Sequence, residues 1–362
     1  MRKEMHPFDL CVLEGTWRQM GEQYGADCAE DILFMRDWWY GLVKYTRNDV
    51  TLESAVDSCR ERFGQIVANC TPHAREFMEG IATGSGLSYE EILFINSADV
   101  FMGGLTDVAD IPRLGCTALA IAKDRTADGK TIIAQNMDWH TDARYIILQF
   151  NPVKGPRFLG ATFTGCCAQM GQSDAGFGFT LNALVADAEP HNGIPMYCLC
   201  QEALSQENIV EAMNVVTTSN RSMAFNYLFA HESGLMVDLE TTIENFGFLL
   251  PEDGFIVHTN HFVTPWLQPK DVTKLFTDTL LRYQRAQNLI RERLGEHTKE
   301  TVQEILRDHE PDRSCSICLH APEGVPYYEA YISNASLINI PADKAIYITE
   351  QPCENRYTKY SL

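Results

Sequence analysis

Long apolar runs are missing from this sequence. No stretch approaches the roughly 18 consecutive apolar residues that a membrane-spanning helix needs. The first fifteen residues, MRKEMHPFDLCVLEG, have a basic start but lack the apolar centre of a secretory signal. We therefore expect a cytoplasmic protein that does not insert into a membrane. Internal repeats and low-complexity linkers are missing as well, which favours one compact domain.

Positive charge is scarce. The chain has 29 Lys and Arg against 49 Asp and Glu, for a formal net charge of −20. Nucleic acids and anionic membranes bind clustered Lys and Arg, so this balance argues against both as partners. An acidic surface would suit a cationic substrate, although such charge more commonly serves solubility.

The remaining composition is that of an ordinary globular protein. Hydrophobic residues make up 45% and charged residues 22% of 362 residues, enough for a sizeable core. Twelve cysteines in a chain of this length, without a secretory signal, indicate reduced thiols and not a disulfide framework.

The first hundred residues have helical patterns. Apolar residues recur at three- and four-residue spacings, which predicts helices over 16–45, 53–70, 71–86 and 87–102. Thr71 followed by Pro72 is a plausible helix start. Ser88 with Glu91 three residues later has the spacing of a capping box.

Strand-like segments begin at Cys116. Residues 116–124 (CTALAIAKD) and 130–139 (KTIIAQNMDW) flank the turn-rich RTADG, which predicts a β-hairpin. Further strands follow up to about residue 184, then helices, then strands again, with two helices within 270–308 and a strand-like tail. Because strands and helices come in blocks without βαβ alternation, we expect an α+β fold of antiparallel sheets covered by helices.

Four short stretches are candidates for chemistry: GCT at 115–117, QNMDW at 135–139, LNAL at 181–184 and HTNH at 258–261. Each is weak by itself. A free cysteine commonly packs as a small hydrophobe. Asn and Asp near strand ends commonly bind their own backbone.

Taken in order, these stretches resemble the acyl-coenzyme A:isopenicillin N acyltransferase family of N-terminal-nucleophile hydrolases. That family is related to choloylglycine hydrolases, penicillin V acylases and insect β-alanyl-dopamine hydrolases. The matching segments cover most of the chain: GTWRQMGEQYG, GCTALAI with AQNMDWH, GFGFTLNAL with GIPMYCLCQEAL, VHTNHF, and CSIC followed by ASLINI.

The resemblance implies a four-layer αββα fold and a precursor that cuts itself between Gly115 and Cys116. Residues 1–115 would form a helical N-terminal segment, and residues 116–362 the catalytic fragment. The two fragments would stay associated as one compact domain. No metal or organic cofactor is expected.

The chemistry of a thiol fits this expectation. Cleavage would give Cys116 a free α-amine, whose ordinary pKa of about 7.7–8.0 lets it take the thiol proton near neutral pH. The same thiol could attack its own preceding carbonyl and make the cut. Gly115 would permit a strained backbone at the scissile bond. We expect a thioester formed from a linear amide (an N-acyl or aminoacyl amine). Either water or a second amine would resolve it, and coenzyme A thioester would be a substrate only in acyl transfer.

The resemblance also implies roles for three polar residues. The Asp138 carboxylate would orient the new amine, and the amide N–H groups of Asn260 and Asn182 would stabilise the oxyanion. A plain turn role stays open for Asp138 and Asn182. Gln135 and Asn136 are expected to be supporting scaffold.

Residues next to the candidate catalytic residues, or on a nearby strand, are candidates for contact with the substrate. Thr117 and Trp139 follow the nucleophile and the aspartate directly. Glu240 and Asp238, in MVDLETT, would suit a cationic amine if they face a pocket, and otherwise would face solvent.

Two departures from the family argue against a penicillin substrate. The residue aligned with a serine of the fungal acyltransferase is Glu240. Leu319 and His320 stand where that enzyme has an arginine after CSIC.

Two rival interpretations stay open. His258-x-x-His261 and Cys315-x-x-Cys318 could form a Cys2His2 zinc site, although alternation at a strand end would point the two histidines apart. The chain could also keep the fold without turnover, which the combined presence of nucleophile, acid and amide argues against. A homo-oligomer is not excluded.

Overall fold

The computed structural model describes residues 8–103, 115–186, 192–268 and 277–362. They form two compact units, and each consists of several chain segments: Met1–Ile111, Ala143–Gly171 and Glu189–Met223 in the first, and Pro112–Asp142, Gln172–Ala188 and Ala224–Leu362 in the second. Both units contain helices and strands, so the predicted α+β class is confirmed. No helix in the described ranges is long and apolar enough to cross a membrane.

The units do not coincide with the expected cleavage fragments. Segments 143–171 and 189–223, which follow Cys116 in sequence, belong to the first unit. The association of fragments 1–115 and 116–362 after a cut stays a prediction.

The first unit is mainly helical. Its helices are α1 (Trp17–Asp27), α2 (Ala29–Thr46), α3 (Leu52–Cys70), α4 (Pro72–Ser85), α5 (Tyr89–Ile95), α6 (Ala98–Gly103), α7 (Met196–Leu204) and α8 (Ile209–Thr218). The single helix predicted over 16–45 is broken at Cys28, which caps both α1 and α2.

Helices α1 and α4 pack with unusually close backbones because both carry glycines at four-residue spacing. A Cβ at Gly21 would lie 2.1 Å from the carbonyl oxygen of Phe77, and a Cβ at Gly80 would lie 2.1 Å from that of Arg18. Only glycine fits such a contact.

One of the two helix starts predicted from capping residues has the expected cap, and the other does not. Ser88 and Glu91 form the predicted reciprocal capping box at α5. Thr71 does precede α4, but its hydroxyl donates to the Val67 carbonyl of α3 and makes no bond to α4. The Thr71 hydroxyl thus caps the end of α3, whereas the sequence pattern predicted that it would cap the start of α4.

The strands of the first unit carry helices on one side. They are β1 (Leu10–Gly15), β4 (Tyr145–Pro152) and β5 (Phe158–Phe163), with β1 parallel and β5 antiparallel to β4. Helix α1 packs against β4, and α7 packs against β5. The chain passes from the first unit to the second within β6 (Met170–Ser173).

The second unit contains two groups of hydrogen-bonded strands and two helices. One group, in spatial order, is β7 (Phe177–Ala183), β8 (Phe225–His231), β9 (Met236–Thr241) and β10 (Phe246–Leu249). The other is β11 (Phe255–His258), β2 (Gly115–Ile121), β3 (Ile132–His140), β12 (Tyr331–Ile340), β13 (Ala345–Thr349) and β14 (Thr358–Ser361). The helices are α9 (Asp278–Arg291) and α10 (Lys299–Leu306).

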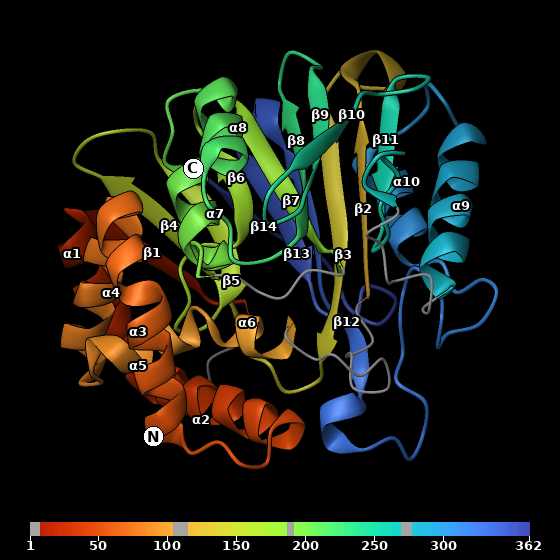
Figure 1. Cartoon of the computed structure of the whole chain (residues 1–362). Helices are drawn as coiled ribbons and strands as arrows, with labels where there is room; N and C mark the ends of the chain where they lie inside the picture. Colours follow the sequence, from red (N-terminus) through yellow and green to blue (C-terminus); the bar gives the residue numbers. More distant parts are fainter. Residues whose placement is uncertain (1–7, 104–114, 187–191, 269–276) are drawn as a thin grey trace. The chain divides into compact units, whose positions relative to one another are not determined.

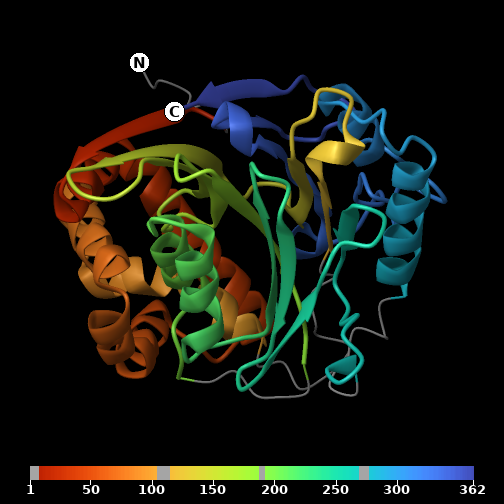
Figure 2. The ribbon, with the colours of Figure 1, turned by 90° about the horizontal axis from the view of Figure 1, so that it is seen from above.

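Side-chain alternation along β2 produces the layers of this unit. Leu119 and Ile121 join an apolar core with Ile290 of α9 and Leu306 of α10. The intervening Ala118 and Ala120 join a second core with residues of β8 and β9. The six-stranded sheet is therefore covered by helices on one face and by the other strands on the opposite face, as Figures 1 and 2 show for α9 and α10.

The predicted hairpin is present and fixes the geometry of the site. Strands β2 and β3 pair antiparallel with Gly115 opposite Asp138 and Cys116 opposite Met137. Because Cys116 has the same parity as Ala118, its side chain points to the face between the two groups of strands.

Candidate active site

The nitrogen of Cys116 is bound by the side chain of Asn260. The backbone N–H of Cys116 donates to Asn260 Oδ1 over 2.8 Å. Asn260 Nδ2 donates to the Ala183 carbonyl over 3.1 Å at the end of β7. Strand β11 ends two residues before Asn260, which places this amide at the end of β2. The sequence predicted Asn260 as an oxyanion donor, but in this uncut chain its oxygen binds the nitrogen that would become the α-amine.

A buried arginine from α9 completes this network. Arg282 donates through Nη1 to the Cys116 carbonyl at 2.7 Å and through Nη2 to Asn260 Oδ1 at 3.0 Å. Its Nε contacts Asp278 one turn earlier at 3.3 Å. Because two donors converge on Asn260 Oδ1, the orientation of that amide is determined by its partners.

Asp138 lies directly over Gly115. Its Oδ1 accepts a 2.7 Å hydrogen bond from Ser333 of β12. A Cβ added at Gly115 would lie 2.4 Å from Asp138 Oδ2. Within the described part of the chain Oδ2 has no hydrogen-bond donor, although it is buried. One carboxyl oxygen is thus held by Ser333, and the other lies against the residue that precedes the candidate nucleophile.

Gly115 leaves room for the Asp138 carboxyl group that lies over it. The strained backbone expected at the scissile bond stays a prediction. The physical requirement is space, because any side chain at this position would collide with the Asp138 carboxyl group.

The titrating groups of the site are shifted toward their neutral forms. Burial raises the pKa of Cys116 to about 11, and the nearby Asp138 charge adds to the rise. Backbone N–H groups of Asp138 and Ala183 and the Arg282 charge oppose it. Burial raises the pKa of Asp138 to about 7, against the effects of Arg282 and Ser333. Near neutral pH the thiol of the uncut chain is protonated, and the carboxyl group is close to its midpoint.

A row of polar side chains crosses β7, β8 and β9 at the same level. Asn182 lies opposite Asn226, and Asn226 lies opposite Glu240. Asn226 Nδ2 donates to Asn182 Oδ1 over 3.3 Å, whereas Asn182 Nδ2 has no acceptor within the described residues. Asn182 is therefore a strand residue with an unused buried donor, not a turn residue.

The acidic residues expected to bind a cationic substrate lie in the interior. Glu240 is fully buried, and its carboxylate accepts from His258 Nε2 and from the backbone N–H groups of Val263 and Thr264. Although burial opposes it, these donors hold the pKa of Glu240 below its usual value. Burial raises the pKa of the equally buried Asp238 to about 6. Glu240 thus holds the chain after β11, and its role toward a substrate stays a prediction.

The other predicted residues either hydrogen-bond to neighbouring groups of the site or lie next to it. Thr117 Oγ1 accepts from Arg282 over 3.2 Å and is fully buried, so it is occupied in this state. Trp139 is half-buried, edge-on to Tyr331. Gln135 binds both backbone groups of Leu181. The predicted scaffolding role of Gln135 is confirmed.

The rival zinc site of HTNH and CSIC does not form a metal-binding group among the described residues. The rings of His258 and His261 do not point apart but stack with centroids 6.5 Å from each other. His258 binds the Thr259 carbonyl and Glu240 through its two ring nitrogens, and His261 Nδ1 lies 3.0 Å from Thr279 Oγ1. Cys315 donates to the backbone of Asp312.

Comparison with known proteins adds the family. The model of a family described as acyl-coenzyme A:6-aminopenicillanic acid acyl-transferase matches residues 125–330, more than half of the chain. The chain belongs to this family. The matched segment contains Asp138, Asn182, Asn260 and Arg282, and it begins after Cys116. Family membership supports an enzyme of acyl transfer or amide hydrolysis.

One curated relative is similar over most of its length. The acyl-coenzyme A:6-aminopenicillanic-acid-acyltransferase 40 kDa form of Emericella nidulans is 24% identical over 316 residues, which are 86% of this chain and 84% of that protein.

Two solved structures of amide hydrolases show weaker likeness. A mutant of the conjugated bile acid hydrolase from Clostridium perfringens matches with 14% identity and a TM-score of 0.48, over 68% of this chain and 97% of that one. Penicillin V acylase from Agrobacterium tumefaciens matches with 11% identity and a TM-score of 0.43, over 65% and 82%.

Sequence reasoning missed two residues of the site. Arg282 follows the spacing of the buried face of α9, together with Thr279, Ala286 and Ile290, and this helical period could have identified it as an interior arginine. Ser333 has no comparable signal, because it contacts Asp138 across 195 residues of sequence.

Proposed function

We propose that this family member is a self-processing cysteine N-terminal-nucleophile hydrolase that cleaves linear amides through a thioester on Cys116. The observation that carries the proposal is the 2.8 Å hydrogen bond from the Cys116 nitrogen to Asn260 Oδ1. An amide oxygen that holds this nitrogen in the uncut chain would hold the free amine in the same place after a cut. Asp138 over Gly115 supports the same assignment from the other side of the bond.

Self-cleavage would transfer the Gly115 acyl group from the Cys116 nitrogen to the Cys116 sulfur. The thiol of Cys116 gives up its proton, the sulfur attacks the Gly115 carbonyl carbon, and the carbon–nitrogen bond breaks as protonated Asp138 delivers a proton to the Cys116 nitrogen. The proton lost by the thiol restores Asp138. Water then hydrolyses the thioester, which releases the Gly115 carboxyl group and regenerates the thiol.

Turnover would use the groups that the cut creates. Departure of Gly115 opens space against Asp138 Oδ2, so this oxygen can bind the new α-amine while Asn260 Oδ1 binds it from the other side. The amine takes the thiol proton, the sulfur attacks the substrate carbonyl, and the leaving amine takes the proton. The unused N–H of Asn182 is the proposed oxyanion donor.

Acyl transfer is the second candidate reaction. It is favoured by the activity of the family and of the fungal relative, both described as acyl-coenzyme A acyltransferases. In this version an acyl-coenzyme A thioester would load Cys116, and a small amine or β-lactam nucleus would remove the acyl group. The expected preference for cationic amines stays a prediction: Glu240 is bound by His258 and backbone N–H groups, whereas both carboxyl oxygens of the buried Asp238 have no hydrogen-bond donor among the described residues. The cytoplasmic location stays a prediction.

Denaturing intact-mass spectrometry tests the proposed function. We expect two fragments that meet between Gly115 and Cys116. Mixing with excess amide or acyl thioester should then add one acyl mass to the 116–362 fragment only. Faster decay of this adduct with added amine than with water alone would identify acyl transfer. A single uncut chain that turns over amides would contradict the self-processing proposal.

Gly115→Ala should slow self-cleavage strongly. The new Cβ would lie 2.4 Å from Asp138 Oδ2 and push the carboxyl group away from the scissile bond. Displacement of a catalytic group by about 1 Å can cost about 10²-fold in rate. The measurement is the time course of fragment appearance after synthesis of the chain. Gly64→Ala is the matched control, because a Cβ there meets nothing within 4 Å, and cleavage should proceed at the wild-type rate.

A further inference from the structure

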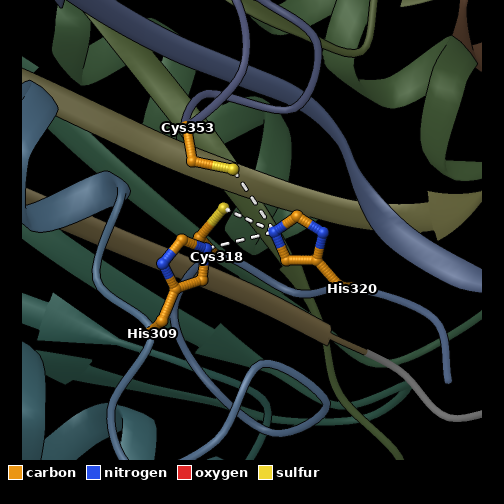
Figure 3. Close-up of side chains that lie close together, drawn as sticks. All are labelled: His309, Cys318, His320 and Cys353. Atoms are coloured by element: carbon orange, nitrogen blue, oxygen red, sulfur yellow. Dashed lines mark hydrogen bonds between the residues drawn. The ribbon is translucent and has the colours of Figure 1, made fainter.

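A cluster of four metal-binding side chains lies in the second unit, outside the proposed active site. His309, Cys318, His320 and Cys353 each offer a ligand atom, and these four atoms lie within 4.8 Å of one another. Figure 3 shows the two sulfur atoms and the His309 ring gathered around one ring nitrogen of His320. Three of the residues come from the loop between α10 and β12, and Cys353 comes from the loop between β13 and β14.

Three distances between the ligand atoms are close to the edges of a tetrahedral zinc site. Zinc–nitrogen bonds of about 2.0 Å and zinc–sulfur bonds of about 2.3 Å give tetrahedron edges of about 3.3 Å between nitrogens and about 3.5 Å between nitrogen and sulfur. Here Nε2 of His309 lies 3.1 Å from Nε2 of His320. The sulfurs of Cys353 and Cys318 lie 3.3 Å and 3.7 Å from the same His320 nitrogen.

We propose that His309, Cys318, His320 and Cys353 bind one structural zinc ion. Four protein ligands and no open position are typical of a structural zinc site, so the ion takes no part in the reaction. The expectation that catalysis needs no metal is therefore unaffected. The rival zinc site considered from the sequence shares only Cys318 with this one.

The charges of the cluster suit a divalent ion. Two thiolates would neutralise Zn²⁺, which keeps the site compatible with the neighbouring Arg313. Burial and the Arg313 charge lower the pKa of both histidines. Burial and Cys353 raise the pKa of the Cys318 thiol, which the backbone N–H of Cys353 opposes. Metal binding would release the thiol protons.

The site would clamp Ser333, the hydroxyl partner of Asp138. Leu319, between two of the ligands, accepts a hydrogen bond from the Ser333 backbone N–H, and its own N–H donates to the Ser333 hydroxyl. On the other side, Gln351, two residues before Cys353, donates to the Ser333 carbonyl. A metal that joins the two loops would hold Ser333 from both sides.

Elemental analysis of the full chain, produced without a histidine tag, tests the site directly. We expect about one zinc per chain, before and after dialysis with added Zn²⁺. His309→Asn and Cys353→Ser should each bind Zn²⁺ at least about tenfold more weakly, since even loss of an outer contact costs 10- to 100-fold. Cys315→Ser is the matched control, because its sulfur lies outside the cluster, and it should retain the metal.

Replacement by Co²⁺ provides a second readout that is independent of variants. Tetrahedral cobalt with two thiolates should give sulfur-to-metal charge-transfer absorption that is absent from Cys353→Ser. Zinc removal should also speed amide hydrogen exchange at 318–320, 333 and 351–353. The proposal is overturned by a well-folded wild type that binds no Zn²⁺, by equal binding in Cys353→Ser, or by a Cys318–Cys353 disulfide in the purified chain. None of these measurements depends on self-cleavage. The zinc proposal can therefore be wrong while the proposed function is right, and the reverse.

Discussion

Replacing Cys116 by Ala is expected to leave a single uncut chain without turnover. The variant lacks the sulfur that would attack the Gly115 carbonyl, and later the substrate, so both reactions stop together. Removal of a nucleophile from a comparable catalytic unit lowers the rate by on the order of 10⁶. The readouts are intact mass after prolonged incubation and amide hydrolysis measured on the same sample.

The control for this substitution is Cys70→Ala, which removes an exposed thiol. It should be processed and active at wild-type rates. Cys116→Ser adds an intermediate case, because a hydroxyl is a weaker nucleophile, and slow cleavage is expected. Full turnover by Cys116→Ala would exclude the proposed nucleophile, and a cut in that variant would mean that another group or a protease makes the break.

Replacing Asp138 by Asn is expected to slow self-cleavage by about 10²–10⁴, the usual contribution of a general acid or base. The pH profile should change with it. In the reactive form, the Cys116 thiol and the Asp138 carboxyl group together hold one proton. The pKa of the thiol is about 11, and that of the carboxyl group is about 7. The wild-type rate should therefore rise through about pH 7 and then level off. In Asp138→Asn only the thiol titrates, so the inflection near 7 should disappear and the rate should rise throughout that range.

The same substitution should make the uncut chain more stable above pH 7. Burial raises the pKa of Asp138 in the folded chain, so the unfolded state loses this proton first as pH rises. Folding stability then falls between the unfolded pKa, about 4, and about 7, by on the order of 1.4 kcal/mol per pH unit. An uncharged Asn avoids that loss.

A matched pair of uncut proteins isolates this effect on stability. Denaturant unfolding of Cys116→Ala and of Cys116→Ala with Asp138→Asn should differ at pH 8 and converge near pH 4. A less stable double variant at pH 8 would show that Asp138 is a structural residue paired in its charged form. A retained inflection near pH 7 in cleavage of the single variant would assign the titration to another group.

Local patterns in the sequence predicted much of the second unit's site. Strand-like runs on both sides of the turn-rich RTADG predicted a hairpin, and its register places Asp138 opposite Gly115. The α+β class followed from the order of strand and helix blocks. The capping box at Ser88 was equally local. Each of these features depends on residues close in sequence, where chain stiffness and side-chain period leave few alternatives.

Features that depend on which backbone lies next to a side chain were not predicted correctly. Thr71 binds the helix before it, and Glu240 binds the backbone after β11. Both are polar residues, and each lies in the helix or strand segment in which the sequence placed it. The tertiary packing decides which backbone groups these side chains bind. The hydrophobic periodicity of a single helix or strand carries no information about those partners.

The sequence by itself determined the candidate nucleophile, the glycine before it and the aspartate on the paired strand, because one hairpin carries all three. Only the tertiary structure decided how they are held. Asn260, Arg282 and Ser333 reach them across 144, 166 and 195 residues of sequence. The four proposed zinc ligands likewise meet only where two loops converge. The physical reason is that a hydrogen bond or a metal bond is set by distances of about 3 Å or less, and contacts that short between distant segments exist only once the chain has packed.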